Sequence, residues 1–490
     1  MMTNAPGNNG LAHSPTRALE TWRGSSPPAA GLGDYEAWWR AEGLAISRAI
    51  DAQGTPALRM HDRWGQPEDH VLYPPEYRHL LGRGYRAGVI AAAVEHDSLL
   101  PGYQIGYVTS WFDPGLYCPY TVSLGTLVPL LKYAPAPVRD RFVPAMTRRD
   151  DDFWQGATWM TEVGGGSDIG THVHTRARRA GEAWRLDGEK YFCSNVNAEL
   201  AVVAARPEGA ADGVRGLALF LAPRRREDGR LNYRIRRLKD KIATRSVPTG
   251  EVVFADSEAW LLGQAEQGIY QIMEVLNTSR VANSIGAAAL VQRALAEAES
   301  FAEQRQLFGR SLREQPLFAR ECRHWHEQWR ECFALAWEAA DLLDGVWRET
   351  PPYSSAYHRF RLLAHLAKFH TADRAVAAAR WAMEAHGGNG VLHEYDAERL
   401  LREAMILAIW EGTPHRQMLD GLEVMARQQA HEALFAHLGE PTGSQAWRER
   451  IGGFLARPVA EREAEIEPLF RDLAAWTARE LARQRLPATG

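Results

Sequence analysis

The sequence has 490 residues, of which 45% are apolar and 24% are charged, and its formal net charge is −4. This length and composition predict a globular protein of several domains with a sizeable core. The charge gives no general attraction to nucleic acid or to anionic membranes, and no segment approaches the roughly 20 apolar residues that span a bilayer. The start of the chain has no signal-peptide pattern and the four cysteines form no disulfide or zinc pattern, so we expect a cytoplasmic protein without a metal.

Hydrophobic periodicity divides the chain into five segments. A start rich in Pro, Gly and Ser is expected to be disordered. Helical patterns follow, then short β-branched and aromatic runs between turn residues, and then long helical patterns. The predicted segments are a disordered 1–33, a helical domain 34–155, an antiparallel β domain 156–263, a helical bundle 264–425 and a helical extension 426–490. The predicted fold class is therefore α+β.

The stretch WMTEVGGGSDIG, residues 159–170, lies at the start of the predicted β domain. Three consecutive glycines allow a ligand to approach the backbone closely, and Thr161 and Ser167 supply hydroxyl groups. The motif is neither GxGxxG nor a Walker loop, and no helix is expected directly after it, so a Rossmann nucleotide site is disfavoured. A plain loop before the β domain remains the alternative.

Three other stretches have both a structural and a functional interpretation. HGGNG, residues 386–390, follows a long helical pattern and is typical of a helix cap, with a close backbone contact at Asn389 and Gly390 as the alternative. Arg305 and Arg310 flank Phe308 and Gly309. The two cations could stabilise the C-terminus of the preceding helix, or they could bind a phosphate group. The basic segment 233–246 predicts a solvated strand face, with phosphate contact as the alternative.

Glu411 is the strongest candidate for a catalytic residue. It follows the apolar run that ends at Trp410 and precedes Gly412, and Thr413 and Pro414 have the residue types of a helix N-cap and first turn. Burial would raise the pKa of this carboxyl, while the helix dipole would lower it. A carboxylate in such a tunable position suits a general base, whereas a solvated loop acid is the alternative.

Together these stretches resemble the acyl-CoA dehydrogenase family of flavoproteins, over about residues 90–425. The matching motifs, in chain order, are MTEVGGGSD, KYFCSN, RSVPTGEVVFAD, EQRQLFGR, HGGNG and IWEGT. The resemblance implies an N-terminal helical domain, a middle antiparallel β domain and a C-terminal four-helix bundle, here with a helical tail. It also implies an FAD cofactor shared between subunits, and hence a homodimer or homotetramer.

The resemblance assigns roles to individual residues. Those implied to bind FAD of the same or the neighbouring subunit are Met160, Thr161, Gly166, Ser167, Phe192, Ser194, Arg305, Phe308, Gln315, Glu384, Gly387, Gly388 and Thr413. Arg280 and Gly412 would contact the substrate. Glu411 would remove the α-proton of an acyl thioester while the flavin accepts hydride from the β-carbon. One branch places this base just before the helix arginine, but Ser279 stands there and cannot serve, so Glu411 is the candidate.

Several residues depart from the common dehydrogenase pattern: Phe192 replaces the usual Trp, and Asn277, Glu384 and Gln315 differ as well. Phe192, the EQPL and RLKDK stretches and the C-terminal tail resemble the alkylation-response, AidB-like branch of the family. The leading hypothesis is an FAD-dependent dehydrogenase of an acyl-CoA or related thioester, with an electron-transfer flavoprotein as acceptor. The alternative is a DNA-damage-response flavoprotein with weak or no turnover, and a flavin oxidase or monooxygenase is a third possibility. Residues 426–490 carry nine Arg and nine acidic residues, so nucleic acid is disfavoured as a partner but left open.

Overall fold

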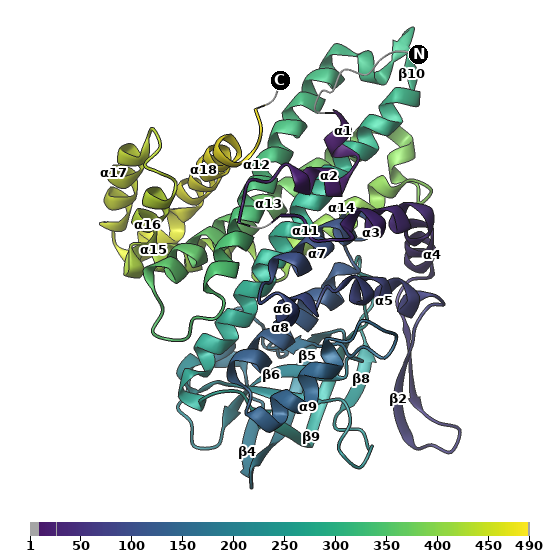
Figure 1. Ribbon diagram of the computed structural model, residues 1–490. Helices are drawn as coiled ribbons and strands as arrows, with labels where there is room; N and C mark the ends of the chain where they lie inside the picture. The colour runs from purple at the N-terminus through teal and green to yellow at the C-terminus, as the bar shows by residue number, and fades with distance from the viewer. Residues whose placement is uncertain (1–8, 26, 489–490) are drawn as a thin grey trace. The chain divides into compact units, whose positions relative to one another are not determined.

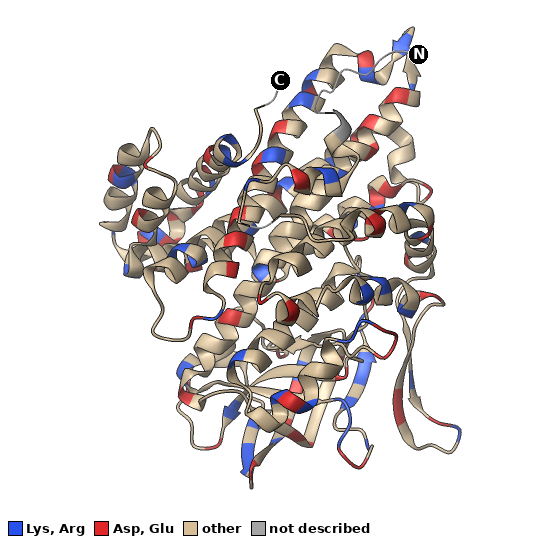
Figure 2. Ribbon diagram, in the orientation of Figure 1, with Lys and Arg blue, Asp and Glu red and all other residues tan. Residues whose placement is uncertain are grey.

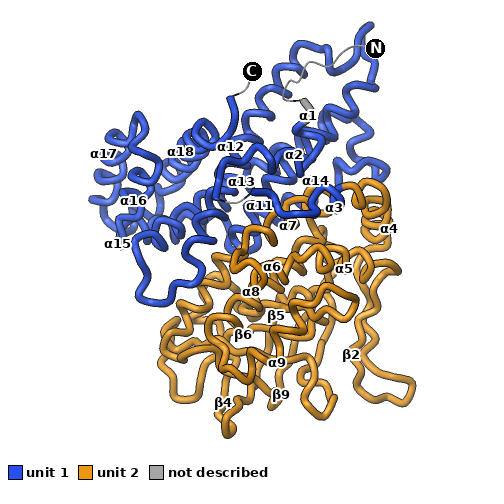
Figure 3. Tube along the Cα trace, in the orientation of Figure 1, with its two compact units in different colours: residues 1–36, 280–490 blue, residues 37–279 orange. Residues whose placement is uncertain are grey.

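The structure is a computed structural model that describes residues 9–25 and 27–488. The chain forms two compact units, which Figure 3 shows in different colours. Residues 37–279, orange in Figure 3 and unit 2 in its key, are called the first unit here. Residues 1–36 and 280–490, blue and unit 1 in the key, are called the second unit. The predicted α+β class is confirmed, with helices before and after a middle β region and a helical tail at the end (Figure 1).

The helical part of the first unit is built around two buried helices. Its helices are the end of α3 (Leu32–Trp38), a π-helical turn at Trp39–Gly43, α4 (Leu44–Gln53), α5 (Tyr77–Ala87), α6 (Ala92–Glu95), α7 (Leu100–Phe112), α8 (Tyr117–Tyr133) and α9 (Ala136–Met146). Nearly every residue of α7 and of α8 as far as Leu130 is buried. A helix covered on all sides needs no polar face, which explains the weak amphipathic pattern of this part of the sequence.

A β-hairpin interrupts this helical region, where only helices and loops were predicted. Strands β1 (Ala57–His61) and β2 (Pro67–Leu72) pair antiparallel around a turn at Gly65. Most side chains of the two strands are exposed, although Asp69 and Val71 are buried. The hairpin has little apolar alternation because it buries only a few residues, so the usual strand pattern is missing from its sequence.

The β region of the first unit has one continuous set of strand pairings. Its strands are β3 (Thr158–Trp159), β4 (Arg176–Ala180), β5 (Ala183–Ser194), β6 (Leu200–Pro207), β7 (Ala218–Pro223), β8 (Arg234–Leu238) and β9 (Thr249–Leu261). The pairings β6–β4–β5–β9–β7 return to β6 and so close a ring, with β3 on β6 and β8 on β9. A core of apolar side chains from these strands includes Trp159, Phe220 and Phe254. Most pairs are antiparallel as predicted, but β3 and β4 each run parallel to β6 over two residues.

The second unit is a helical bundle with a helical tail. Its elements are the C-terminal part of α11 (Gly268–Gln304), α12 (Pro316–Val346), α13 (Ser355–Ala385), α14 (Asp396–Ile409) and α15 (Pro414–Gln428), followed by α16 (Ala430–His437), α17 (Ser444–Leu455) and α18 (Val459–Arg485). A short hairpin of β10 (Gln306–Leu307) and β11 (Arg310–Ser311) joins α11 to α12. Helix α13 packs against α12, α14, α15 and α18, so it forms the centre of the bundle. The exact limits of the predicted domains stay predictions.

The N-terminal segment differs from the disorder that its composition predicted. Residues 1–8 and 26 of that prediction lie outside the described residues, but α1 (Asn9–Ala12) and α2 (Pro15–Glu20) form within the rest. Leu19 is buried, and the Trp22 indole donates a hydrogen bond to Asp341 of α12 at 3.0 Å. Two large apolar side chains and a few polar contacts to the bundle order this segment, which a composition average does not detect.

Candidate functional site

The predicted flavin loop, residues 160–169, lies in the first unit and leads from β3 into the short helix α10 (Ile169–His172). The expectation that no helix follows the glycine motif was wrong, because α10 begins directly after it. Asp168 caps this helix by accepting a hydrogen bond from the Thr171 N–H at 3.2 Å. The loop bends at Gly165, whose φ of 129° favours glycine. A Cβ on Gly166 would lie 2.5 Å from the Thr161 hydroxyl, so a larger residue there would displace the Thr161 side chain.

A buried ion pair anchors this loop, and the sequence analysis missed it. The Glu162 carboxylate accepts hydrogen bonds from the Lys190 ammonium at 2.7 Å and from the Thr175 hydroxyl at 2.6 Å. It also accepts from the backbone N–H groups of His174 and Thr175. Burial opposes both charges and lowers the pKa of Lys190, but the ammonium and the other donors hold the pKa of Glu162 below its ordinary value.

The structure brings the loop and the end of β5 together, as the predicted flavin site requires. The Tyr191 N–H donates to the Thr161 carbonyl at 3.0 Å, and the Trp159 indole donates to the Ser194 carbonyl at 3.1 Å. Phe192 is 55% exposed, so its ring is available to pack on a planar ligand. Thus all six residues assigned to the flavin in this unit lie on two adjoining segments.

Lysine side chains surround this strand end. The Lys239 ammonium lies 3.2 Å from the centre of the Tyr191 ring and 4.8 Å from that of Phe192, and it donates to Glu251 at 2.8 Å. The Lys241 ammonium donates to the Thr249 hydroxyl, which in turn lies 3.2 Å from the Ser194 hydroxyl. The basic segment 233–246 therefore contributes buried contacts as well as the exposed strand face that was predicted.

In the second unit, Glu411 lies in the loop between α14 and α15. Thr413 is the N-cap of α15 and accepts from the Arg416 N–H, with Pro414 in the first turn, so the predicted helix start is confirmed. Glu411 itself has φ 59° and Gly412 has φ 100°, two consecutive left-handed residues that turn the chain sharply. The Glu411 side chain is half-buried. This loop acid therefore has a backbone held in an uncommon conformation, with its side chain partly shielded from solvent.

Two cations act on Glu411: Arg280, which was predicted to contact the substrate, and Lys368, which the sequence analysis missed. The Arg280 guanidinium donates to the Glu411 carbonyl at 3.1 Å and pairs with Asp420 at 3.1 Å. Burial raises the pKa of Glu411, while the charges of Arg280 and Lys368 act in the opposite direction. The predicted substrate residues Arg280 and Gly412 therefore lie directly beside the predicted base.

The residues assigned to a neighbouring subunit's FAD lie at the far ends of α11 and α13. Phe301 stacks on His386 with ring centroids 4.3 Å apart, which brings the β10–β11 hairpin and HGGNG segments close together. Arg305 is exposed and Phe308 is 94% exposed, and a Cβ on Gly387 or Gly388 would meet nothing within 4 Å. Gln315 instead bonds the Leu307 carbonyl, and Glu384 pairs with Arg380. This surface has exposed groups suited to a flat, charged ligand.

Replacing Arg305 by alanine is expected to weaken FAD retention several-fold without changing the stability of the bundle, because the side chain is exposed. Flavin absorbance per subunit after gel filtration measures the effect. Arg348→Ala, an arginine of the same unit that no cofactor role involves, is the matched control. Unchanged flavin content in Arg305→Ala would contradict the role of Arg305 in FAD binding.

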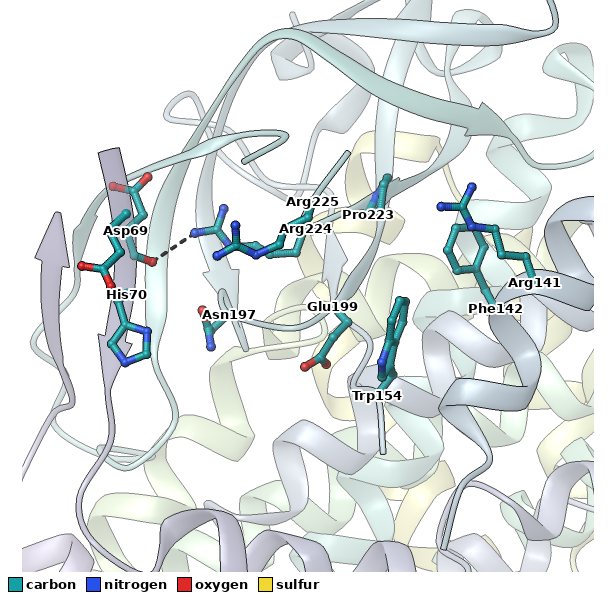
Figure 4. Close-up of a pocket in the computed structure, with 11 residues that line it drawn as sticks. Asp69, His70, Arg141, Phe142, Trp154, Asn197, Glu199, Pro223, Arg224 and Arg225 are labelled. Carbon is teal, nitrogen blue, oxygen red and sulfur yellow. Dashed lines mark hydrogen bonds between the residues drawn. The ribbon is translucent and has the colours of Figure 1, made fainter. Parts of the chain in front are cut away.

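The structure contains two notable cavities, of which only one is lined by residues assigned to the site. One of about 250 Å³ lies in the first unit between the β1–β2 hairpin, α9 and the sheet, and none of the assigned residues lines it (Figure 4). Its buried Arg224 donates to the Asp69 and Tyr233 carbonyls. The other, of about 770 Å³, lies in the second unit along α13 and is lined by Glu384 and Lys368 among others. Among the described residues, no group of three or more His, Cys, Asp or Glu side chains is placed to hold a metal.

Family models match most of the chain. They are Acyl-CoA dehydrogenase, C-terminal domain, over residues 266–426; Acyl-CoA dehydrogenase, middle domain, over 157–257; and Adaptive response protein AidB N-terminal domain, over 23–153. Each matched stretch contains one of the regions described above. The fold and the two clusters thus define a protein of the acyl-CoA dehydrogenase type.

Individual relatives agree with these matches. The AidB protein of Escherichia coli (strain K12) is 31% identical over 411 residues, which cover 79% of this chain and 72% of that protein. Acyl-CoA dehydrogenase family member 11 of Caenorhabditis elegans is 30% identical over 387 residues, 76% of this chain, and the match spans 62% of that longer relative. A crystal structure of Caenorhabditis elegans ACDH-11 in complex with C11-CoA has a TM-score of 0.81 at 25% identity, covering 98% of this chain and 88% of that one.

The chain belongs to the AidB-like branch of the acyl-CoA dehydrogenase family. Members of the family are FAD-binding oxidoreductases, so the predicted cofactor and flavoprotein class are confirmed at the level of the family. The residues present fit such a cofactor, because the glycine loop, the exposed Phe192 ring and the Ser194 hydroxyl adjoin one another. In the part of the chain that the structure describes, no helix is long and apolar enough to cross a bilayer.

Proposed function

We propose that this protein is an FAD-dependent dehydrogenase that forms the α,β double bond of an acyl-CoA or related thioester, with Glu411 as the base. The observation that carries the proposal is the setting of Glu411, a half-buried carboxylate in a left-handed turn beside Arg280 and Lys368. A base for a weakly acidic α-proton needs a fixed position and a tuned pKa. The ACDH-11 structure with C11-CoA supports acyl-CoA as the carrier.

The chemistry divides between the protein and the cofactor. The α-proton moves to the Glu411 carboxylate, and bound FAD supplies the acceptor for the hydride from the β-carbon, which leaves a 2-enoyl thioester. Arg280 donates to the Glu411 carbonyl and so fixes the backbone from which the carboxylate extends. Arg280 is bound to Asp420 as well, and it therefore acts on the turn and has limited freedom to meet a substrate.

Oligomer and acceptor belong to the same proposal. The exposed Arg305, Phe308 and Gly387–Gly388 surface supports a homodimer or homotetramer in which subunits share FAD. An electron-transfer flavoprotein is the proposed acceptor. The four cysteines are all free and buried, which supports a cytoplasmic location.

Product analysis tests the proposal. Holoenzyme incubated with C11-CoA and an artificial electron acceptor is expected to yield an acyl-CoA lighter by two hydrogens, detected by mass spectrometry. Shorter and longer saturated acyl-CoAs define the chain-length range. Recovery of every thioester unchanged, with the flavin intact, would contradict dehydrogenation.

The match to an AidB N-terminal domain favours a second candidate, a DNA-damage-response flavoprotein with weak or no turnover. DNA binding requires a basic surface, because phosphate neutralisation provides most of the affinity. Figure 2 shows acidic and basic residues interspersed over α16–α18, and Arg448, Arg450 and Arg457 pair with acidic side chains there. We therefore expect no retention of duplex DNA at 0.15 M salt in a gel-shift assay; salt-sensitive retention would support the second candidate.

A further inference from the structure

The turn that carries Glu411 needs external support. Residues with a Cβ lose about 1–2 kcal/mol in the left-handed conformation, and Glu411 has φ 59°. Gly412 follows with φ 100°, and a Cβ there would lie 2.7 Å from the Gln417 amide nitrogen. Because the backbone alone does not favour this path, contacts from neighbouring elements must stabilise it.

Three side chains from three helices hold the two carbonyl groups of this turn. The Glu411 carbonyl accepts from Arg280 of α11 at 3.1 Å and from Gln417 of α15 at 3.0 Å. The Gly412 carbonyl accepts from Lys368 of α13 at 2.7 Å and again from Gln417 at 3.0 Å. Lys368 also donates to the Ala408 carbonyl at 3.0 Å and so ties the end of α14 to the turn.

The use of lysine at position 368 is unusual for this chain. Only five of its 57 basic residues are lysines, and none of the five is exposed. Lys132, Lys190 and Lys239 each pair with a glutamate, and Lys241 donates to a carbonyl and two hydroxyls. The hydrogen bonds of Lys368 go to two carbonyls on either side of Glu411. The ammonium is compact and its three donors rotate freely, whereas a guanidinium holds its donors in a larger planar fork.

The charges around Lys368 connect it to the protonation of Glu411. Burial lowers the pKa of Lys368 to about 7, the Glu411 carboxylate acts to raise it, and Arg280 lowers it further. Asp420 and Arg416 of α15 face Arg280, and the buried His365 of α13, whose pKa is lowered to about 3, remains neutral. Arg280 shares its charge with Asp420, so Lys368 is the other cation that can favour an ionised Glu411.

We propose that Lys368 is a positioning residue that fixes the Glu411 turn and keeps the carboxylate ionised for proton abstraction. This inference rests on the proposed role of Glu411 and adds a second function to the bundle helix α13. A positively charged Lys368 favours the ionised form of Glu411, lowers the pKa of this carboxyl and so lets it act as a base at lower pH. Loss of that charge should therefore move the acid limb of the pH–rate profile to higher pH.

Exchange of the α-protons of C11-CoA with solvent deuterium, followed by NMR on the holoenzyme, tests this role because it requires the base and no hydride transfer. Lys368→Met is expected to move the acid limb of the exchange rate up by about one pH unit and to lower the rate above it. Lys368→Arg retains the charge, so its limb should stay near the wild-type position while its rate falls. An acid limb unmoved in Lys368→Met would overturn the proposal.

Two further variants keep the test decisive if Lys368→Met fails to fold. Asp420→Asn frees the charge of Arg280 and should move the acid limb to lower pH, whereas Gln417→Leu removes two donors and should lower the rate without moving the limb. If the acid limb of the exchange rate does not move in Asp420→Asn, nearby cations do not set the pKa of Glu411 and the proposal is contradicted. Glu411→Gln is measured in parallel, because persistent exchange in that variant would reject Glu411 as the base whatever Lys368 does.

Discussion

Glutamine at position 411 is expected to leave FAD binding intact and to reduce turnover by about 10² to 10⁴-fold, the usual contribution of a positioned general base. The amide has nearly the same shape as the carboxylate but cannot accept the α-proton. The hydrogen bonds to the 411 and 412 carbonyls involve the backbone, so the turn should persist. Steady-state rates with an artificial acceptor and the flavin spectrum measure the two properties separately.

A neighbouring acid provides the control for this substitution. Glu398 of α14 pairs with Arg402 through two hydrogen bonds and has no assigned role in the reaction. Glu398→Gln should therefore keep turnover within a small factor of wild type. Turnover near the wild-type level in Glu411→Gln would reject the assignment of the base, even if both variants bind FAD normally.

Methionine at position 190 should have the largest effect on stability and FAD content. It removes the ammonium from Glu162 and leaves a buried carboxylate with its remaining donors only. Breaking a buried ion pair typically destabilises a protein by about 3–5 kcal/mol. Because Glu162 follows Thr161 directly, we also expect the glycine loop to lose its fixed position and FAD to dissociate. Chemical denaturation and flavin content report the two effects.

A double substitution distinguishes the loss of the Glu162–Lys190 ion pair from a nonspecific loss of stability. Lys190→Met combined with Glu162→Gln removes both charges and should recover part of the lost stability, since no unpaired carboxylate remains. Arg236→Met breaks an exposed pair with Glu189 on the same sheet and should change the unfolding free energy by less than about 1 kcal/mol. Simple additivity of the two single substitutions would contradict a coupled pair.

Local sequence rules predicted the parts of this protein whose structure depends on neighbouring residues. Thr413 and Pro414 start α15 because an N-cap hydroxyl and a fixed proline φ act within one turn. The long helices and the strands of the β region were predicted from their periodicity. Motif order placed Glu411 and the glycine loop, and the structure places Arg280 and Gly412 beside that base.

Features that depend on distant contacts were missed. Glu162 and Lys190 lie 28 residues apart, and Lys368 reaches the Gly412 carbonyl across 44 residues, so no local pattern marks either contact. The N-terminal helices become ordered through Trp22 and Asp341, which the chain separates by 319 residues. The β1–β2 hairpin buries few side chains and so lacks the alternation that identifies a strand. The scarcity of lysine was visible in the sequence and could have pointed to positions 190 and 368.

An anaerobic titration of the purified holoenzyme with saturated acyl-CoAs, followed in the visible spectrum, tests the central claim most directly. We expect one chain-length class, including C11-CoA, to bleach the oxidised flavin band in wild type and not in Glu411→Gln. A flavin spectrum unchanged by every acyl-CoA would contradict a dehydrogenase, and it would favour the damage-response or oxidase alternatives.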